Sequence, residues 1–299
     1  MRKTFIAAAV ALAVSAGAAQ AQGRDFSKVE ITATKLADGV HMLTGAGGNI
    51  GVSSGDDGVF LVDDQFAPLT VKILAAIRKI TPKPVKFVVN THWHFDHTGG
   101  NENLGKAGTV IVAHDNVREL MRVDQVISAF GRKIPAAPKA ALPVITFNDT
   151  TTFHMNGQTL RVRHMPAAHT SGDSIVHFVE ADVVHMGDLF FNGFYPFIDV
   201  EHGGSAAGMI KAADAVLAMA GPNTKIIPGH GPLADKVALR AYRDMLKGVH
   251  DAVKKLVDAG TPRAEAVAAQ PTQAFDAEWG DGFLRPEVFA GFVYDSMTK

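Results

Sequence analysis

The segment Thr-His-Trp-His-Phe-Asp-His at residues 91–97 limits the possible folds of this chain more than any other feature. It directly follows an apolar run, Val85 to Val89, that has the length and β-branched composition of a buried strand. Four residues of metal-binding types therefore crowd at one strand end. The alternative is a histidine-rich surface loop or a set of core histidines, but ligand clusters at this spacing seldom arise without a metal.

The spacing within this cluster predicts two adjacent metal ions. Side chains alternate along an extended chain, so His92 and His94 point to the same side. A turn after the strand can direct Asp96 and His97 to a neighbouring point. We therefore expect His92 and His94 to bind one ion and Asp96 and His97 to bind the other.

Three further candidate ligands also follow predicted strands. His169 comes after the strand at residues 160–165, Asp188 after that at 183–186, and His230 after that at 225–227, in a Pro-Gly-His-Gly-Pro turn. Each signal alone is weak. Together, and in this order behind the first cluster, they predict that the chain completes a metal site at one edge of its sheets.

The chain contains no cysteine and 13 histidines. Disulfides, thiolate catalysis and cysteine-ligated zinc are therefore excluded. Imidazole and carboxylate are the ligands that zinc accepts when sulfur is absent. Any metal must be held by His, Asp or Glu.

The remaining pattern predicts strands followed by helices in each half of the chain, compatible with two similar sheet-plus-helix layers packed face to face. Residues 123–143, with several prolines and small residues, are interpreted as an excursion over the surface. After Gly260 the pattern predicts only a short helix at 263–269. The other predicted strands are 29–34, 40–44, 50–53, 59–62, 110–113, 151–154 and 174–179, and the other helices are 70–80, 117–121, 205–219 and 232–259.

The first 21 residues have the pattern of a secretory signal peptide. Met1-Arg2-Lys3 supplies the positive start, an apolar run follows, and Ala19-Gln20-Ala21 offers small residues for cleavage. The apolar run is shorter than the roughly 20 residues needed to span a bilayer. We expect a mature chain that begins near Gln22, located in the periplasm if the host has an outer membrane. Residues 22–299 are interpreted as a single domain with a C-terminal helical extension.

The formal net charge is −1, and charges of both signs are mixed along the chain. No electrostatic field therefore favours nucleic acid or an anionic membrane. The expected partner is a small-molecule substrate, and no feature of the sequence indicates an oligomeric state.

From about Val29 to Pro232, the sequence resembles the metallo-β-lactamase superfamily, whose His-x-His-x-Asp-His motif it matches in full. The resemblance implies an α/β fold, specifically a four-layer αββα sandwich with the metals at one edge. It also implies two zinc ions per chain. The implied ligands are His92, His94 and His169 for the first zinc, Asp96, His97 and His230 for the second, and Asp188 as the bridge between them.

The implied chemistry is hydrolysis. Two zinc ions about 3.5 Å apart lower the pKa of a shared water from about 15.7 towards about 7, which supplies hydroxide at neutral pH. This zinc-bound hydroxide attacks a carbonyl carbon, and a zinc ion stabilises the developing oxyanion. Asp96 is a second catalytic candidate because it can accept a proton from the nucleophile.

The resemblance does not identify the substrate, because the same metal site serves many reactions in such a superfamily. The absence of cysteine excludes the lactamase subclasses with a Cys ligand, and no Lys shortly follows Asp188 to bind a β-lactam carboxylate. The bridging Asp188 resembles the glyoxalase II, lactonase and phosphodiesterase branches. The signal peptide disfavours a cytosolic thioester, and charge disfavours nucleic acid. We predict β-lactam opening, with lactone, ester or thioester hydrolysis as alternatives and a non-catalytic periplasmic zinc-binding protein as a different class.

Several other residues near the predicted ligands have two readings. Trp93 and Phe95 either line the substrate cleft or pack the opposite face, and an aromatic run after Asp188 forms either a pocket wall or core. Asp63 either orients a ligand histidine or lies in a solvated turn. The aromatic run comprises Phe190, Phe191, Phe194, Tyr195 and Phe197; Asn192 and Tyr195 are candidate oxyanion donors; His114, His185 and His202 are interpreted as structural histidines or partners of ligands.

Overall fold

The computed structural model describes residues 25–298 of the chain. The predicted signal peptide, residues 1–21, lies outside the described residues. Within them, no helix is both long and apolar enough to cross a bilayer.

The first half of the chain forms a seven-stranded sheet in the order β1-β2-β3-β4-β5-β6-β9. Strands β1 to β4 pair antiparallel, as predicted, and β4, β5, β6 and β9 pair parallel. Parallel neighbours place their carboxyl ends at one edge of the sheet, where β5 leads into the histidine cluster. The strands are β1 (Thr32–Ala37), β2 (Val40–Thr44), β3 (Ile50–Gly55), β4 (Gly58–Val62), β5 (Val85–Val89), β6 (Val110–His114) and β9 (Ile145–Phe147).

The second half forms a five-stranded sheet in the order β10-β11-β12-β13-β14. Its first four strands pair antiparallel, and β13 and β14 pair parallel, so the chain leaves both of them at the same edge. The strands are β10 (Thr150–Met155), β11 (Gln158–His164), β12 (Ser174–Phe178), β13 (Val183–His185) and β14 (Lys225–Ile227).

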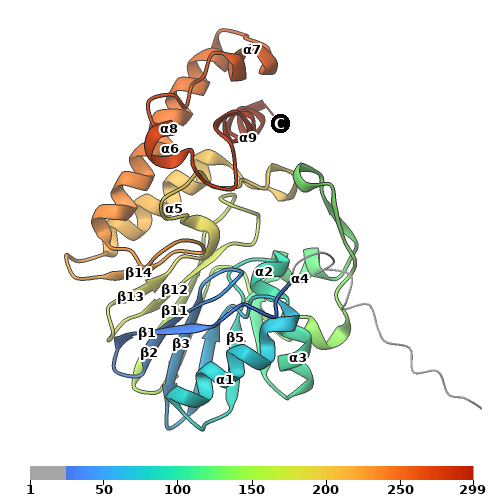
Figure 1. Cartoon of the computed structure of the whole chain (residues 1–299), viewed down its shortest axis with the longest axis vertical. Helices are drawn as coiled ribbons and strands as arrows, with labels where there is room; N and C mark the ends of the chain where they lie inside the picture. Colours follow the sequence, from blue (N-terminus) through green and yellow to red (C-terminus); the bar gives the residue numbers. More distant parts are fainter. Residues whose placement is uncertain (1–24, 299) are drawn as a thin grey trace, which may run out of the picture.

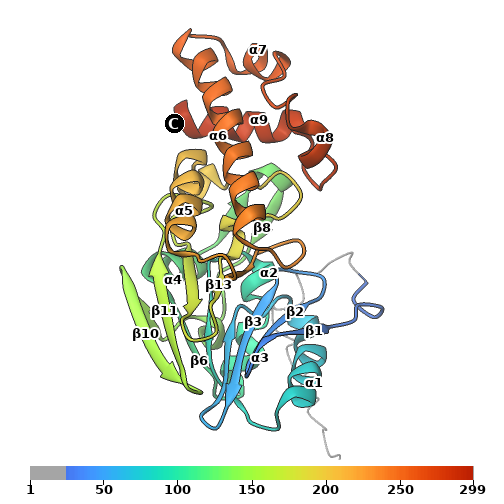
Figure 2. The ribbon, with the colours of Figure 1, turned by 90° about the vertical axis from the view of Figure 1, so that its left-hand side faces the viewer.

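The two sheets pack face to face, with helices on both outer faces (Figure 2). Between the sheets, apolar residues such as Phe60 and Val112 of the first contact residues such as Val162 and Phe178 of the second. On the outer face of the first sheet lie α1 (Thr70–Ile80) and α3 (Asn101–Lys106). On that of the second lie α5 (Ala206–Met219) and α6 (Lys236–Asp258). The predicted αββα sandwich is confirmed.

The segment predicted as a surface excursion has a more specific structure. It contains a two-stranded ribbon of β7 (Gln125–Ile127) and β8 (Arg132–Ile134), and α4 (Asp115–Met121) precedes it. Ile127 and Ile134 are buried in a small core with Trp93. The ribbon is therefore anchored beside the histidine cluster, and its outer residues alone are exposed.

The tail after Gly260 is more helical than predicted. Beyond α7 (Arg263–Ala268), which the pattern predicted, come α8 (Asp276–Trp279) and α9 (Pro286–Thr298). Phe289 and Val293 of α9 are buried in the core that α5 and α6 share with the second sheet. Figure 1 shows these helices gathered at one end of the molecule, with the green ribbon segment reaching towards them. The apolar residues of α9 surround its axis, so no helical periodicity marks it in the sequence.

Candidate metal centre

The seven predicted ligands converge at one edge of the sandwich, although they come from four separate segments. His92 and His94 lie in the loop after β5, and Asp96 and His97 lie on the short helix α2 (Phe95–Thr98) that follows. The other three lie after strands of the second sheet: His169 after β11, Asp188 in the single turn Gly187–Leu189 after β13, and His230 after β14.

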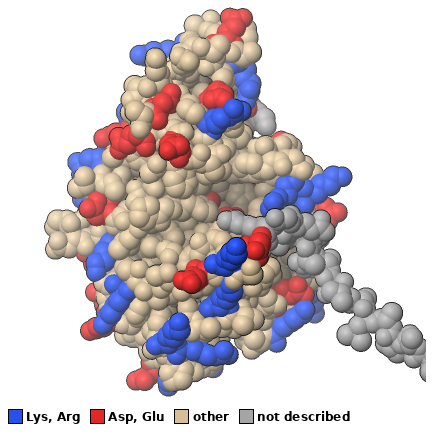
Figure 3. Space-filling view, viewed as in Figure 1, with Lys and Arg blue, Asp and Glu red and all other residues tan. Residues whose placement is uncertain are grey.

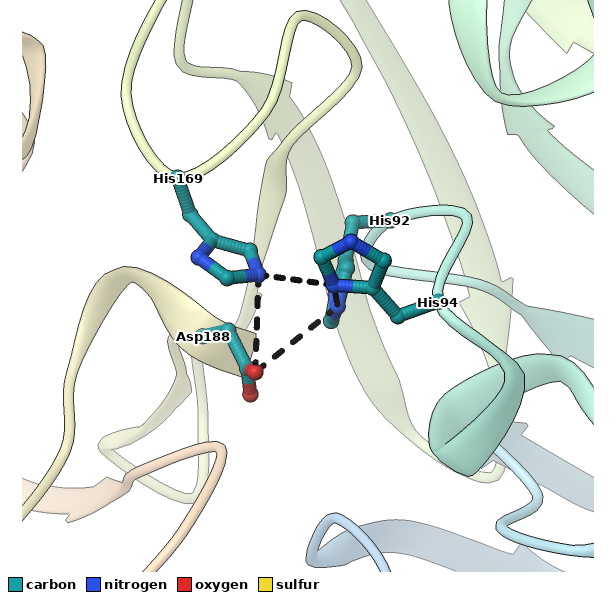
Figure 4. A group of neighbouring side chains, drawn as sticks. All are labelled: His92, His94, His169 and Asp188. Carbon is teal, nitrogen blue, oxygen red and sulfur yellow. Dashed lines mark hydrogen bonds and ion pairs between the residues drawn. The ribbon is translucent and has the colours of Figure 1, made fainter. Parts of the chain in front are cut away.

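The first group joins His92, His94, His169 and Asp188, all of which are buried (Figure 4). Nδ1 of His94 lies 3.1 Å from Nε2 of His92 and 2.9 Å from Nε2 of His169. Oδ2 of Asp188 lies 3.5 Å from Nε2 of His169. Three imidazole nitrogens and one carboxylate oxygen thus face a common point.

The second group joins Asp96, His97 and His230. Nε2 of His97 lies 3.3 Å from Nε2 of His230 and 3.9 Å from Oδ2 of Asp96, and the latter oxygen lies 3.3 Å from His230. The side chains of Asp96 and His230 are 21% and 23% exposed, whereas that of His97 is fully buried. This group therefore forms the open side of the centre.

Asp188 connects the two groups. Its Oδ1 lies 3.0 Å from Nε2 of His97 and 3.4 Å from that of His230, while Oδ2 faces the first group. Gly229 makes room for it, since a Cβ at this position would overlap Oδ1 of Asp188. Oδ1 is buried and accepts no hydrogen bond among the described residues, so its lone pairs are directed at the space between the imidazoles.

Each buried histidine uses the ring nitrogen that points away from the two groups for a hydrogen bond, and this bond fixes the tautomer and the orientation of the ring. Nδ1 of His97 donates to Oδ2 of Asp63 at 2.7 Å, and Nδ1 of His169 donates to the Phe197 carbonyl at 2.8 Å. The Thr91 hydroxyl donates to Asp63, so its oxygen accepts from Nδ1 of His92. In the neutral ring, each donation leaves the other ring nitrogen with a lone pair, as metal ligation requires.

His94 is held in the opposite tautomer by a residue that the sequence analysis missed. Its Nε2 lies 3.0 Å from Oδ2 of Asp199, so its Nδ1 carries the inward lone pair. His202 contacts the same carboxylate at 2.7 Å. His202, which the sequence analysis interprets as a structural histidine or a partner of a ligand, thus reaches His94 through Asp199. Nothing in the local sequence of Asp199 marks its role.

Burial dominates the electrostatics of the first group. It lowers the pKa of His92 well below its usual value and that of His169 to about 4. Both rings are therefore neutral at pH 7, the form that binds metal.

The second group carries charge in the absence of a cation. Burial by itself lowers the pKa of His97 and His230, but the Asp188 and Asp96 carboxylates outweigh it, raising the pKa of His230 to about 9 and that of His97 well above its usual value. Conversely, burial raises the pKa of Asp188, but His230, His97 and His92 hold it well below its usual value. The carboxylates therefore remain ionised and require positive charge nearby.

These observations fit a pair of metal ions. Inward lone pairs, ionised carboxylates and a buried acceptor with no hydrogen bond are directed at two adjacent points. The donor set consists of nitrogen and oxygen alone, which suits zinc among other transition metals.

A cavity of about 490 Å³ opens onto both groups. Figure 3 shows a largely uncharged area across the centre of the face it displays, with both signs of charge scattered around it and no continuous basic stretch. His94, Asp96, Asp188 and His230 reach the cavity wall. The rest of the lining consists of Phe26, Ala46, Phe66, Phe95, Ile127, Phe130, Arg132, Phe191, Phe194, Phe197 and Phe283.

The aromatic run after Asp188 divides between the cavity and the core. Phe191, Phe194 and Phe197 line the cavity, as one reading predicted. Phe190 instead packs on Tyr242 in the core. The ribbon residues Ile127, Phe130 and Arg132, and Phe283 before α9, were not predicted as cavity residues.

The two predicted oxyanion donors point elsewhere. The Tyr195 hydroxyl is buried and donates to Oδ1 of Asp276 at 2.8 Å, and Asn192 donates to the Pro232 carbonyl at 3.0 Å. The prediction is therefore wrong for Tyr195, which is fully buried, and it stays a prediction for Asn192, which is partly exposed. His114 accepts a hydrogen bond from the Asn116 amide, and His185 bonds the Asn49 carbonyl, which confirms their structural role.

Comparison with known proteins agrees with the geometry. The sequence model of the metallo-beta-lactamase superfamily matches residues 43–230. Acyl-coenzyme A thioesterase MBLAC2 of Bos taurus is 26% identical over 161 aligned residues, which cover 48% of this chain and 54% of that protein. The chain thus spans about half the length of this relative.

Two solved structures share the fold. A metallo-beta-lactamase from Pontibacter korlensis is 22% identical, with a TM-score of 0.58 over 73% of this chain and 99% of that one. The sec-alkylsulfatase Pisa1 from Pseudomonas sp. is 18% identical, with a TM-score of 0.64 over 88% of this chain and 50% of that one. Because the superfamily model covers more than half of the chain, the protein belongs to the metallo-β-lactamase superfamily.

Proposed function

We propose that this protein is a dinuclear zinc hydrolase that cleaves a carbonyl bond in a small, largely apolar substrate. The observation that carries the proposal is the opening of both ligand groups into one apolar cavity, through the part-exposed side chains of Asp96 and His230. A structural zinc site is normally closed by four protein ligands. An open site beside a cavity favours catalysis over metal storage.

The chain's own residues have distinct roles in this proposal. His92, His94 and His169 would hold one ion and Asp96, His97 and His230 the other, and Asp188, which lies between the two groups, would serve both. When bound, the ions supply Lewis-acid activation of water at neutral pH. Asp96 is ionised, because His97 and His230 lower its pKa against the effect of burial, and it is partly exposed. The lowered pKa keeps Asp96 ionised, and the proposal assigns proton transfer at the cavity mouth to this carboxylate because it is the more exposed of the two in the lining.

A β-lactam is the first substrate to test, since it presents a strained carbonyl on a compact, partly apolar body that suits the cavity. A thioester with an apolar acyl chain is the second. The thioesterase relative and the phenylalanine-rich lining favour it.

The test is turnover by the purified protein with its zinc loaded, removed and restored. Nitrocefin, a lactone and an acyl thioester are compared, and activity should vanish on chelation and return with zinc. His169→Ala should abolish turnover, while His154→Ala, an exposed histidine on β10, should leave it unchanged. Two tightly bound zinc ions without turnover of any carbonyl substrate would contradict the proposal and favour the zinc-binding protein.

We also propose export to the periplasm, based on the signal-peptide pattern at residues 1–21. Fractionation of the native host, with N-terminal sequencing of the mature chain, tests this. A chain that starts at Met1 and remains in the cytoplasm would refute it.

A further inference from the structure

One basic side chain lies in the wall of the cavity. Arg132 of β8 is the sole Lys or Arg in the lining formed by residues 25–298. Its guanidinium carbon lies 4.5 Å from the centroid of the Phe95 ring. Arg132 and Phe95 line the same cavity as His94, Asp96, Asp188 and His230, so the cation faces the same space as the metal-binding groups.

The positive charge of Arg132 has no acidic partner in the described part of the chain, where no carboxylate pairs with it. The two acidic residues of the lining, Asp96 and Asp188, are engaged with His230 at 3.3 and 3.4 Å. A half-buried guanidinium stacked on an aromatic ring retains five donors that match a carboxylate in bidentate geometry. Arg132 is therefore available to an anion from outside the protein.

The ribbon that carries Arg132 is anchored at several points. Oε1 of Gln125 lies 3.2 Å from Nε2 of His202, and the Ser128 amide donates to Oε2 of Glu201 at 3.1 Å. Ile127 and Ile134 are buried in the core around Trp93. These contacts hold the ribbon beside the ligands, so Arg132 has a defined position.

Much of the remaining cavity wall is aromatic. Phe283 packs on Phe191 and Phe194 with centroids 6.2 and 5.9 Å apart, and Phe130 of the ribbon packs on Phe197 at 4.8 Å. An apolar body lying between these rings loses its contact with water on several sides.

We infer that the cavity binds a substrate with an apolar body and a carboxylate, and that Arg132 binds the carboxylate while the scissile carbonyl lies at the two ligand groups. Only the position of the scissile carbonyl in this inference rests on the proposed function. Recognition of the carboxylate by Arg132 stands on the ribbon and the cavity.

Kinetics with two matched esters test the inference. 4-Nitrophenyl octanoate and mono-4-nitrophenyl suberate share their leaving group and chain length, but only the second carries a carboxylate. Arg132→Gln should raise KM for the suberate ester about ten- to a hundredfold, the range for a lost charged hydrogen bond, and change KM for octanoate less than about threefold. Lys133→Gln is the matched control, because Lys133 is the exposed neighbour outside the cavity lining.

Binding provides a readout that is independent of turnover. Octanohydroxamate and suberic acid monohydroxamate share a metal-binding head, and the second adds a distal carboxylate. Calorimetry with the zinc-loaded protein should show tighter binding of the suberic compound. Arg132→Gln should abolish that preference, and Lys133→Gln should preserve it.

The outcomes separate the two proposals. Equal binding of both hydroxamates, with an unchanged suberate KM in Arg132→Gln, would overturn the role of Arg132 while ester cleavage upheld the hydrolase. A carboxylate preference that disappears in Arg132→Gln, without cleavage of any ester, would uphold Arg132 and overturn the proposed function.

Discussion

The carboxylate of Asp199 lies 3.0 Å from Nε2 of His94, a residue 105 positions earlier in the chain. Asp199 is 1% exposed, and hydrogen bonds from His202 and His94 hold its pKa well below the usual range despite burial. It therefore acts as an ionised acceptor that directs Nδ1 of His94 towards the other ligands. This is the one buried histidine of the centre whose orientation differs from the rest.

Asp199→Asn should weaken metal binding by the first group. An amide can present its NH₂ to His94 and favour the wrong tautomer, and loss of such an outer partner typically costs about ten- to a hundredfold in metal affinity. Competition with a chromophoric chelator measures the change. Asp258→Asn, at the exposed end of α6, is the control and should bind metal as the unchanged protein does. Equal affinities for the two variants would contradict an orienting role for Asp199.

Zinc should leave the two groups at different pH values. The raised pKa of His230, about 9, means that protons compete with metal at the second group from about pH 9 downward. In the first group the lowered pKa of His169, about 4, keeps protons from competing until near pH 4. Metal content after dialysis should therefore fall from about two ions per chain at about pH 9 to about one at about pH 6.

His230→Ala is the control for this titration. It should bind one ion whose affinity changes little over the same interval, because the remaining group keeps its neutral histidines. Simultaneous loss of both ions, or earlier loss from the first group, would show that the two groups do not differ in proton competition.

Phe283→Ala should impair substrate binding without unfolding the protein. Phe283 is 56% exposed, so little of the core depends on it, but it packs on two phenylalanines of the cavity wall. The substitution removes the contact between the Phe283 ring and the substrate. An aromatic contact contributes about 0.5–1.5 kcal/mol, so KM for apolar substrates should rise about two- to tenfold. Val237→Ala, an exposed apolar residue on α6, should not change KM. An unaltered KM in Phe283→Ala would place the substrate away from this wall.

Tyr195→Phe should affect stability and leave catalysis intact. The hydroxyl is buried and donates to Asp276, so its removal should lower the free energy of unfolding by about 1–2 kcal/mol. Urea denaturation measures this loss, and kcat should stay within about twofold of the original if the hydroxyl takes no part in the reaction. A large fall in kcat with unchanged stability would restore Tyr195 as an oxyanion donor.

The sequence by itself determined the strand ends and the residues placed on them. Period-two and apolar runs, interrupted by Gly and Asp, predicted most strands of the two large sheets to within a few residues, and β5 matched at both ends. The short strands β7, β8 and β9 were not predicted. Parallel strands place their carboxyl ends at one edge of the sheet, so polar residues that directly follow them lie close together there. His92, Asp188 and His230 were therefore predicted together although they are far apart in sequence.

Only the tertiary structure decided the environment around those residues. Tyr195 and Phe191 stand four positions apart in one aromatic run, yet Tyr195 stacks on Phe289 of α9 in the core, whereas Phe191 lies against His230 and Phe283 in the cavity lining. Arg132 and Phe283 belong to segments without periodicity, whose positions are set by burial of distant apolar residues. Local sequence encodes the metal-binding groups because they follow the ends of regular strands, whereas long-range packing, which no local pattern records, assembles the substrate cavity.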